Sequence, residues 1–336
     1  MFPPNPGTFR FSEGPLSPDW LPARGRVNAV LVFVDFPDAP GGNVIDTLVR
    51  SHTAQLAWFD EASYGRFGLS VTPVTSWFRL PRPTTSYSPL PGSVHHPDLF
   101  ADAIAAADAA VDFSAYRAVI VAGARGWSQG VAGPFLASSG SGVRADGTEI
   151  RYGVVLGPSI LDSGTPGNTV NHEFLHTLGL PDVHGGASTV GSWDPMAQNS
   201  ATHLLGWHKW LLGWLDPAQL SCQLQPGTRE ETLGPLHTPG GKKLVVVPTS
   251  ATTAHAIEVR RRGGYDGGIC KEGVLVYRID SLTPSAQGPI SVGNREGGCF
   301  PAGSPYVVGG VFDDAAVKVE VLASDGRAYR IRVTRK

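Results

Sequence analysis

The first half of the chain alternates between continuous apolar runs and segments whose apolar residues recur at helical spacing. Residues 27–36 are almost wholly apolar and rich in β-branched side chains, which predicts a strand buried on both faces and ended by Pro37. Residues 46–63 keep helical spacing, with Asp46 as the candidate N-cap. Further strands are predicted over 67–80, 116–122 and 151–156, and further helices over 97–111 and 201–214. This order predicts a mixed, twisted α/β sheet.

From about residue 218 the pattern changes to short β-rich runs separated by Gly and Pro turns. These runs cover residues 243–247, 255–260, 273–280, 307–312, 317–321 and 329–333. Such spacing is typical of a β-sandwich. Residues 1–24 are Pro-rich and without periodicity, and the Gly/Ser-rich stretch 123–147 predicts a long loop. We therefore predict an extended arm over 1–24, an α/β domain over 25–217 and an all-β, sandwich-like domain over 218–336.

The overall composition gives no sign of a specialised partner. The 336 residues are 41% apolar and carry a formal charge of −2, which is ordinary for a globular protein and favours neither nucleic acid nor a membrane as a partner. No apolar run approaches the ~20 residues that span a bilayer. Arg260-Arg261-Arg262 is the only local basic cluster, and we interpret it as a solvated strand end.

The chain has three cysteines. Cys270 and Cys299 both lie in Gly-rich stretches and are candidates for a disulfide, which would leave Cys222 unpaired. The sequence alone does not fix the pairing. None of the three has the C-x-x-C spacing of a metal or redox site.

The strongest chemical signal is the stretch that ends at Asp182 and reads H-E-x-x-H-x-x-G-x-x-D. On a helix, His172 and His176 lie at i and i+4, so both imidazoles project from one face and can share a metal ion. Glu173 is offset from that face, but it can reach a water on the metal and take its proton. Gly179 can adopt the positive φ that turns the chain back, so that Asp182 offers an oxygen as third ligand.

Three protein ligands and one water describe an open, catalytic zinc site rather than a closed structural one. With ordinary frequencies of His and Glu, H-E-x-x-H occurs by chance in roughly one or two chains of this length in a hundred, and the Gly and Asp lower this about another hundredfold. The alternative is an amphipathic core helix that carries two partnered histidines. The spacing of the motif favours a metal site over this alternative.

Five further stretches, together with the zinc motif, resemble a known protein family. They are the turn Gly191–Ala197, which contains Trp193-Asp194-Pro195-Met196, and Val30–Asp38, Ser63–Phe67, Gly206–Leu215 and Gly273–Asp280. Together these stretches resemble the immune inhibitor A-type (M6) metallopeptidases, over about residues 26–282. The resemblance implies a secreted bacterial zinc endopeptidase of metzincin-like fold, in which a methionine turn forms an apolar floor beneath the metal.

The resemblance also implies roles for individual residues. His172, His176 and Asp182 would be the zinc ligands, Glu173 the general base and acid, and Met196 the methionine of the turn.

Two positions depart from the family pattern. Val183-His184-Gly185 follows the predicted third ligand where the family usually has an aromatic and an acidic residue, so His184 is an alternative third ligand. Gln198 stands where many metzincins place a tyrosine that stabilises the oxyanion, which leaves that role unassigned.

We expect a zinc-dependent endopeptidase that hydrolyses peptide bonds in proteins, using metal-activated water and Glu173 as base. The alternative is a non-catalytic secreted binding protein with a vestigial zinc site, against which the intact Glu173 argues. We expect a protein or peptide substrate, a monomer and an extracellular location, although residues 1–7 show no signal peptide. Asp35 and Asp38 could contribute to a Ca²⁺ site near the first strand.

Overall fold

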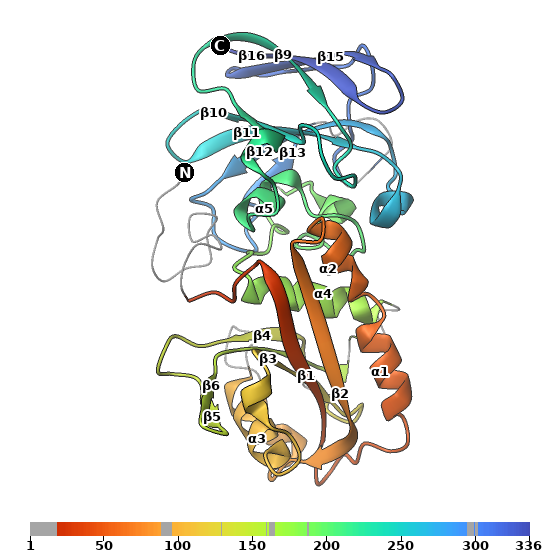
Figure 1. Cartoon of the computed structure of the whole chain (residues 1–336), viewed down its shortest axis with the longest axis vertical. Helices are drawn as coiled ribbons and strands as arrows, with labels where there is room; N and C mark the ends of the chain where they lie inside the picture. Colours follow the sequence, from red (N-terminus) through yellow and green to blue (C-terminus); the bar gives the residue numbers. More distant parts are fainter. Residues whose placement is uncertain are drawn as a thin grey trace. The chain divides into compact units, whose positions relative to one another are not determined.

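The computed structural model describes residues 19–88, 96–128, 130–158, 160, 165–186, 188–293, 299 and 302–336. Over these residues the protein is mixed α/β, with several sheets and few helices (Figure 1). It divides into two compact units, which we call the N-terminal unit (19–60 and 67–178) and the C-terminal unit (61–66 and 179–336). None of the described helices is long and apolar enough to cross a membrane. Most of the arm predicted over 1–24 lies outside the described residues.

A five-stranded sheet forms the centre of the N-terminal unit, in the order β2-β1-β3-β7-β4. Its strands are β1 (Gly25–Asp35), β2 (Phe67–Arg79), β3 (Ala118–Gly123), β4 (Gly133–Leu136) and β7 (Tyr152–Leu156). The first four in spatial order run parallel, and β4 pairs antiparallel with β7 at the edge. The strands predicted near 27–36, 67–80, 116–122 and 151–156 are therefore confirmed.

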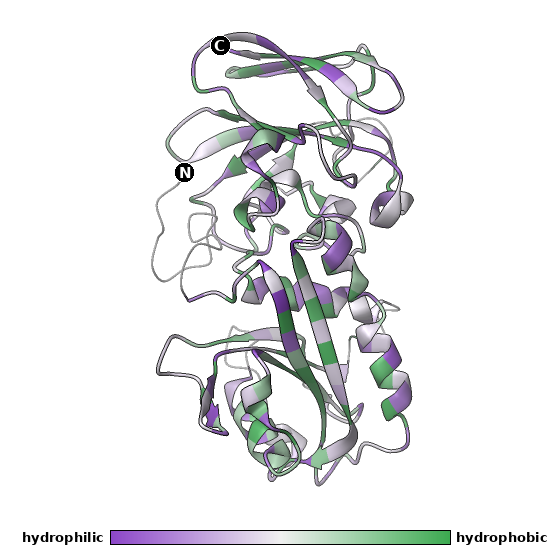
Figure 2. Ribbon diagram, in the orientation of Figure 1, coloured by the Kyte–Doolittle hydropathy of each residue, from purple (hydrophilic) through white to green (hydrophobic). Residues whose placement is uncertain are grey.

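The two faces of this sheet are covered by different helices, because successive side chains of a strand point to opposite faces. The even-numbered valines of residues 30–34 join a buried core with α3 (Pro97–Ala107). Phe33 points to the other face, where its ring lies edge-on to His52 of α1 (Ile45–Thr53) at 6.2 Å between centroids. Burial on both faces explains the unbroken apolar run of residues 29–34 in β1, a strand that Figure 2 colours partly as hydrophobic.

The helix predicted over 46–63 is two helices, α1 and α2 (Ala57–Ala62). The hydroxyl of Thr53 donates to the carbonyl of Val49 at 2.8 Å, a local bond that competes with continued helix. Asp46 is not the N-cap as predicted. It lies inside the first turn, where its carboxylate still interacts favourably with the helix dipole.

Two other predicted elements differ from those in the structure. The stretch 123–147 is not a plain loop, because it contains β4 and the strand β5 (Val143–Ala145), which forms a hairpin with β6 (Thr148–Ile150). The helix predicted over 201–214 is shortened to α5 (Gly206–Leu211).

The C-terminal unit contains two sheets, in the orders β13-β12-β11-β10-β8 and β14-β15-β16-β9. Their strands are β8 (Leu220–Cys222), β9 (Gly227–Leu233), β10 (Leu244–Pro248), β11 (Thr253–Arg260), β12 (Gly273–Asp280), β13 (Ile290–Val292), β14 (Val311–Asp313), β15 (Val317–Ser324) and β16 (Tyr329–Arg335). Residues of both sheets, such as Val276 and Val319, share one buried apolar core. Two sheets that share one core form the arrangement of a β-sandwich.

The compact units do not follow the predicted domain boundaries. Residues 179–217, which the sequence analysis assigned to the domain 25–217, cluster with the strands of the C-terminal unit, and so does the short stretch 61–66. The functional domains 25–217 and 218–336 stay a prediction.

Cys270 and Cys299 form a disulfide, and Cys222 is an exposed free thiol. The bond closes a loop with a sequence separation of 29 residues. A cross-link of this kind stabilises a protein chiefly by restricting the unfolded chain.

We expect Cys270→Ser to lower the free energy of unfolding by roughly 3–4 kcal/mol, the amount that chain entropy assigns to a loop of this size. Urea unfolding of the oxidised protein measures this loss. Cys222→Ser is the matched control and should leave the unfolding midpoint within error. A Cys270→Ser protein as stable as the control would show that the disulfide contributes nothing to the stability of the C-terminal unit.

Candidate metal centre

His172, Glu173 and His176 of the metal motif lie on α4 (Pro166–Thr177) in the N-terminal unit. Pro166 occupies the first turn, where its missing N–H costs nothing and its fixed φ favours the helix. At the other end, the carbonyl of Thr177 accepts a hydrogen bond from the backbone N–H of Leu21 at 3.0 Å. Every residue from Gly167 to Thr177 is buried, so α4 is an internal helix with no solvent face.

Contacts on several sides fix the rotation of α4. Phe174 lies two residues beyond His172 and thus about 200° around the helix from it. The Phe174 ring packs against those of Phe59 and Phe67, with centroid distances of 5.7 and 6.4 Å. The side-chain amide of Asn171 donates to the carbonyl of Gln55 at 2.9 Å. These contacts turn the histidine-bearing side of the helix away from the aromatic cluster.

His172, Glu173 and His176 come together as the motif predicts. Each offers one ligand atom, and these atoms all lie within 4.8 Å of one another. The two imidazole rings are perpendicular, with an interplanar angle of 89° and 4.9 Å between centroids. All three residues are buried, at 6–8% exposed. Among the described residues, this is the only group of three or more His, Cys, Asp or Glu side chains close enough to hold a metal ion.

The donor set fits a divalent transition metal. Two neutral imidazoles are common zinc ligands, and a carboxylate oxygen beside them suits either the metal or a water that the metal holds. All three ligand atoms come from residues 172–176 of a single helix. The geometry therefore provides a place for a metal ion, without specifying which one.

Gly179 has the positive φ that the sequence analysis required, at +97°. It begins the C-terminal unit, which also holds both predicted third ligands, Asp182 and His184. Nε2 of His184 lies 3.5 Å from Oδ1 of Asp182. The Asp182 side chain is 22% exposed and that of His184 is 50% exposed, so the carboxylate is the more buried of the two candidates.

Met196 is completely buried, and Asp194 holds its turn in place. The Asp194 carboxylate accepts hydrogen bonds from the backbone N–H groups of Met196 and Leu205, at 2.8 and 2.7 Å. It also lies 2.7 Å from Nδ1 of His208 in α5. The sequence analysis gave Asp194 no role, although an aspartate two residues before the methionine is the ordinary signal of a side chain that caps a turn.

The turn also bonds to the segment of the predicted third ligand. The backbone N–H of Val183 donates to the carbonyl of Met196 at 2.9 Å. Residues 182–184 and the methionine turn are thus parts of one hydrogen-bonded structure within the C-terminal unit.

The interpretation of Arg260 as part of a solvated strand end is wrong. Its side chain has no exposed surface, and its guanidinium donates to Asp266 at 2.7 and 3.0 Å and to Glu258 at 3.2 Å. It also donates to the carbonyls of Trp193 and His203, at 3.0 and 3.1 Å. A buried guanidinium is tolerated only when its donors are paired, and these five bonds pair them. Arg260 therefore links β11 to the methionine turn.

Lys209 of α5 extends this buried network. Its ammonium lies 3.0 Å from Nδ1 of His203, whose Nε2 lies 2.9 Å from a carboxylate oxygen of Glu61. The same ammonium stands over the ring of Tyr64, 4.2 Å from the centroid. Burial, only partly offset by Asp266, lowers the pKa of Lys209 to about 7. Burial also lowers the pKa of His203, which favours its neutral form.

The carboxylates considered for calcium have protein partners. Asp35 accepts two hydrogen bonds from Arg79, at 2.6 and 3.0 Å, and one from the N–H of Gly41. Asp38 accepts two from Thr84. The pKa of Asp35 is lowered because these bonds outweigh its burial. The two residues therefore brace the loop after β1, and a Ca²⁺ site stays a prediction with no ligand group among the described residues.

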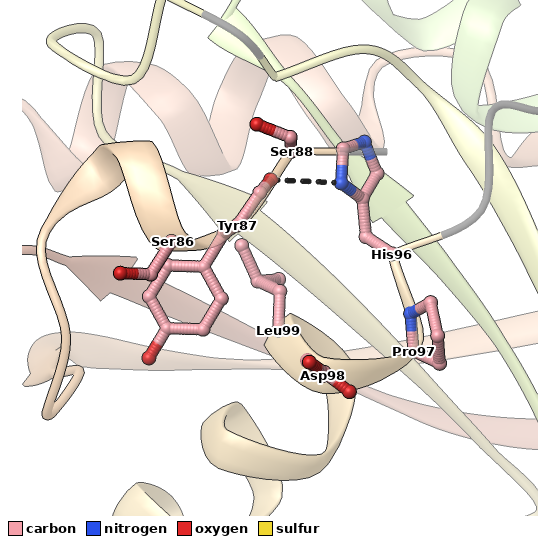
Figure 3. Close-up of a pocket in the computed structure, with 7 residues that line it drawn as sticks. All are labelled: Ser86, Tyr87, Ser88, His96, Pro97, Asp98 and Leu99. Carbon is pink, nitrogen blue, oxygen red and sulfur yellow. Dashed lines mark hydrogen bonds between the residues drawn. The ribbon is translucent and has the colours of Figure 1, made fainter. Parts of the chain in front are cut away.

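A separate small hollow lies beside the start of α3, lined by Ser86, Tyr87, Ser88, His96, Pro97, Asp98 and Leu99 (Figure 3). Its volume is about 30 Å³, room for about one water molecule and not for a peptide. His95 lies outside the described residues, whereas His96 is buried, with Nδ1 3.1 Å from the carbonyl of Tyr87.

Lys209 makes the stability of the protein depend on pH. Between its folded-state pKa of about 7 and its ordinary value of 10.5, the unfolded chain binds one more proton than the folded protein, so raising the pH favours folding. We expect the free energy of unfolding to rise between pH 7.5 and 10, by up to about 1.4 kcal/mol per pH unit from this group. Lys209→Met should remove that part of the rise.

Denaturant unfolding at several pH values measures the difference between the two proteins. Lys318→Met, at a partly exposed position of β15, is the control and should keep the wild-type slope. Parallel curves for wild type and Lys209→Met would show that the buried ammonium keeps its proton throughout this range.

Comparison with known proteins assigns no family to this geometry. No protein-family model matches the sequence, and no curated protein of similar sequence was found. The functional conclusion must therefore come from the residues of this chain and their contacts.

Proposed function

We propose that the protein is a zinc-dependent endopeptidase of metzincin-like fold, secreted by a bacterium. The observation that carries the proposal is the group formed by His172, Glu173 and His176, whose ligand atoms lie within 4.8 Å of one another on one buried helix. A structural zinc site would be closed by four protein ligands, whereas this group supplies two imidazoles and an acid. That combination is the one needed for hydrolysis by metal-activated water.

His172 and His176 would hold the zinc, with Asp182 as the third ligand. The turn at Gly179 and the greater burial of Asp182 relative to His184 support this choice. Zinc, when bound, supplies Lewis acidity toward a carbonyl oxygen and lowers the pKa of water.

Glu173 would move the protons. Its carboxylate accepts a proton from the water whose oxygen attacks the peptide carbonyl carbon, and the C–N bond then breaks. The same carboxyl group returns the proton to the departing amine, so the residue is regenerated at the end of each turnover. The closeness of the Glu173 carboxylate to the two imidazoles supports this role, because a water on a metal held by the histidines would lie beside it.

Met196 and its turn support the metzincin-like assignment. The methionine is fully buried and its turn is held by three contacts to Asp194, as a rigid apolar floor requires. The alternative of a binding protein with a silent zinc site has no observation of its own in its favour.

Glu173→Gln keeps the size of the side chain and removes the base. We expect it to lower the rate of casein degradation by about 10²–10⁴-fold, the usual contribution of a general base. The assay compares fluorescent casein fragments released by wild type and variant, each with its zinc content measured.

Glu230→Gln makes the same chemical change on the exposed strand β9 and should leave the rate unchanged. If the zinc-loaded Glu173→Gln protein cleaves as fast as wild type, Glu173 is not the base. If neither protein cleaves casein or a panel of other unfolded proteins, the endopeptidase assignment fails.

Asp182→Ala should weaken zinc binding more than His184→Ala, because only the first removes a ligand. Competition with a chromophoric chelator gives both affinities, and we expect a loss of at least about 10-fold for Asp182→Ala. The opposite order would make His184 the third ligand.

A further inference from the structure

The segment that carries the predicted third ligand is hydrogen-bonded to a loop far along the chain. We call residues 282–288, which follow β12, the 282–288 loop. The backbone N–H of Asp182 donates to the hydroxyl oxygen of Ser285 at 3.0 Å. The N–H of Ala286 donates to the carbonyl of Asp182 at 3.1 Å, and the N–H of Gly288 to the carbonyl of His184 at 2.9 Å. Both backbone groups of Asp182 are thus held by the loop.

Two glycines allow the backbones to approach this closely. A Cβ on Gly185 would lie 2.1 Å from the carbonyl oxygen of Ala286, and one on Gly186 would lie 2.4 Å from that of Gln287. Both glycines have positive φ, at +82° and +52°, which other residues rarely adopt. Ala286 itself has a φ of +59°, a strained conformation for a residue with a side chain. Such strain persists only where the surrounding contacts impose it.

The bonding continues from the third-ligand segment to the methionine turn. The hydroxyl of Thr189 donates to the carbonyl of Val292 and accepts from its N–H, at 3.0 and 2.9 Å. The N–H of Gly303 donates to the carbonyl of Thr189 at 2.7 Å, and the indole N–H of Trp193 donates to the carbonyl of Gly303. Residues 285–292 and Gly303 therefore support this segment at several points between Asp182 and Met196.

We propose that Ser285 is a positioning residue for the metal centre, through which the 282–288 loop fixes the backbone of Asp182 for zinc binding. The inference rests on the proposed function in so far as Asp182 is the third ligand. Ser285 touches neither metal nor substrate. It acts by restricting a backbone that would otherwise be free to move between conformations, only some of which present the carboxylate to the ion.

The effect should appear in metal affinity, because a ligand that is held in place loses little conformational freedom on binding. A serine that merely stabilised the fold would lower the melting temperature of the metal-free protein without changing the zinc affinity of the folded molecules. The two roles are therefore separated by measuring both quantities on the same full-length variants.

The experiment measures Zn²⁺ affinity of the full-length protein by competition with a chromophoric chelator, for wild type, Ser285→Ala and Ser285→Thr. Ser281→Ala is the matched control. Ser281 lies in the same β12–β13 connection as Ser285, but its hydroxyl donates to the carbonyl of Thr252, at 3.0 Å, and not to the segment of Asp182. We expect Ser285→Ala to weaken zinc binding on the order of 10-fold. Ser285→Thr, which keeps the hydroxyl, and Ser281→Ala should stay within about twofold of wild type.

A Ser285→Ala protein that binds zinc as tightly as Ser281→Ala would overturn the inference. Ser285 is only partly buried, so the variant should fold, and the melting temperature of the metal-free protein checks this. Gly186→Ala provides a second variant, because its methyl group forces the two backbones apart, and it should weaken zinc binding at least as much as Ser285→Ala.

Asp182→Ala separates this inference from the proposed function. If it weakens zinc binding and Ser285→Ala does not, the positioning role alone is refuted. If it leaves the affinity unchanged, both the third-ligand assignment and the positioning role are refuted. If both variants weaken zinc binding as expected but the wild-type protein cleaves no polypeptide, the proposed peptidase activity is refuted and the positioning role is supported.

Discussion

The arrangement of the site depends on α4 being buried on every side. Two histidines and a glutamate are buried on this helix, which is costly unless these polar groups are paired, and burial limits the positions that their side chains can take. The aromatic contacts of Phe174 and the bond between Leu21 and Thr177 hold the helix in one rotation. Helical spacing brings the two imidazoles together, and the packing of the N-terminal unit holds the helix that carries them in one orientation.

A second constraint acts within the C-terminal unit, where charges are buried without access to water. Arg260 is compensated by Asp266 and Glu258, and its remaining donors bind the carbonyls of Trp193 and His203, on either side of Met196. Replacing one member would leave the others unpaired, which costs more than the net energy of the ion pairs. The turn thus derives part of its rigidity from Arg260 of strand β11, which lies 67 residues beyond Trp193.

Local patterns in the sequence predicted the local features of the structure. The strand at 27–36 was recognised because burial on both faces produces an unbroken apolar run, and the His172 and His176 pair because helical spacing alone brings them together. The burial of Arg260 was missed, since a run of three arginines carries no sign of the distant Asp266. The bond between Asp182 and Ser285 joins residues 103 apart, and no periodicity encodes such a contact. Disulfide pairing was likewise open until the structure joined Cys270 to Cys299.

The pairing of Asp182 with the 282–288 loop has a consequence for synthesis of the chain. When the ribosome has completed α4, both histidines are present, but the partners of Asp182 have yet to be made. At about 5–20 residues per second, the next hundred residues take on the order of 5–20 s. During that interval the segment around Asp182 lacks its hydrogen bonds to the 282–288 loop. The backbone of Asp182 therefore takes up its observed hydrogen bonds only after the 282–288 loop has been made and has folded.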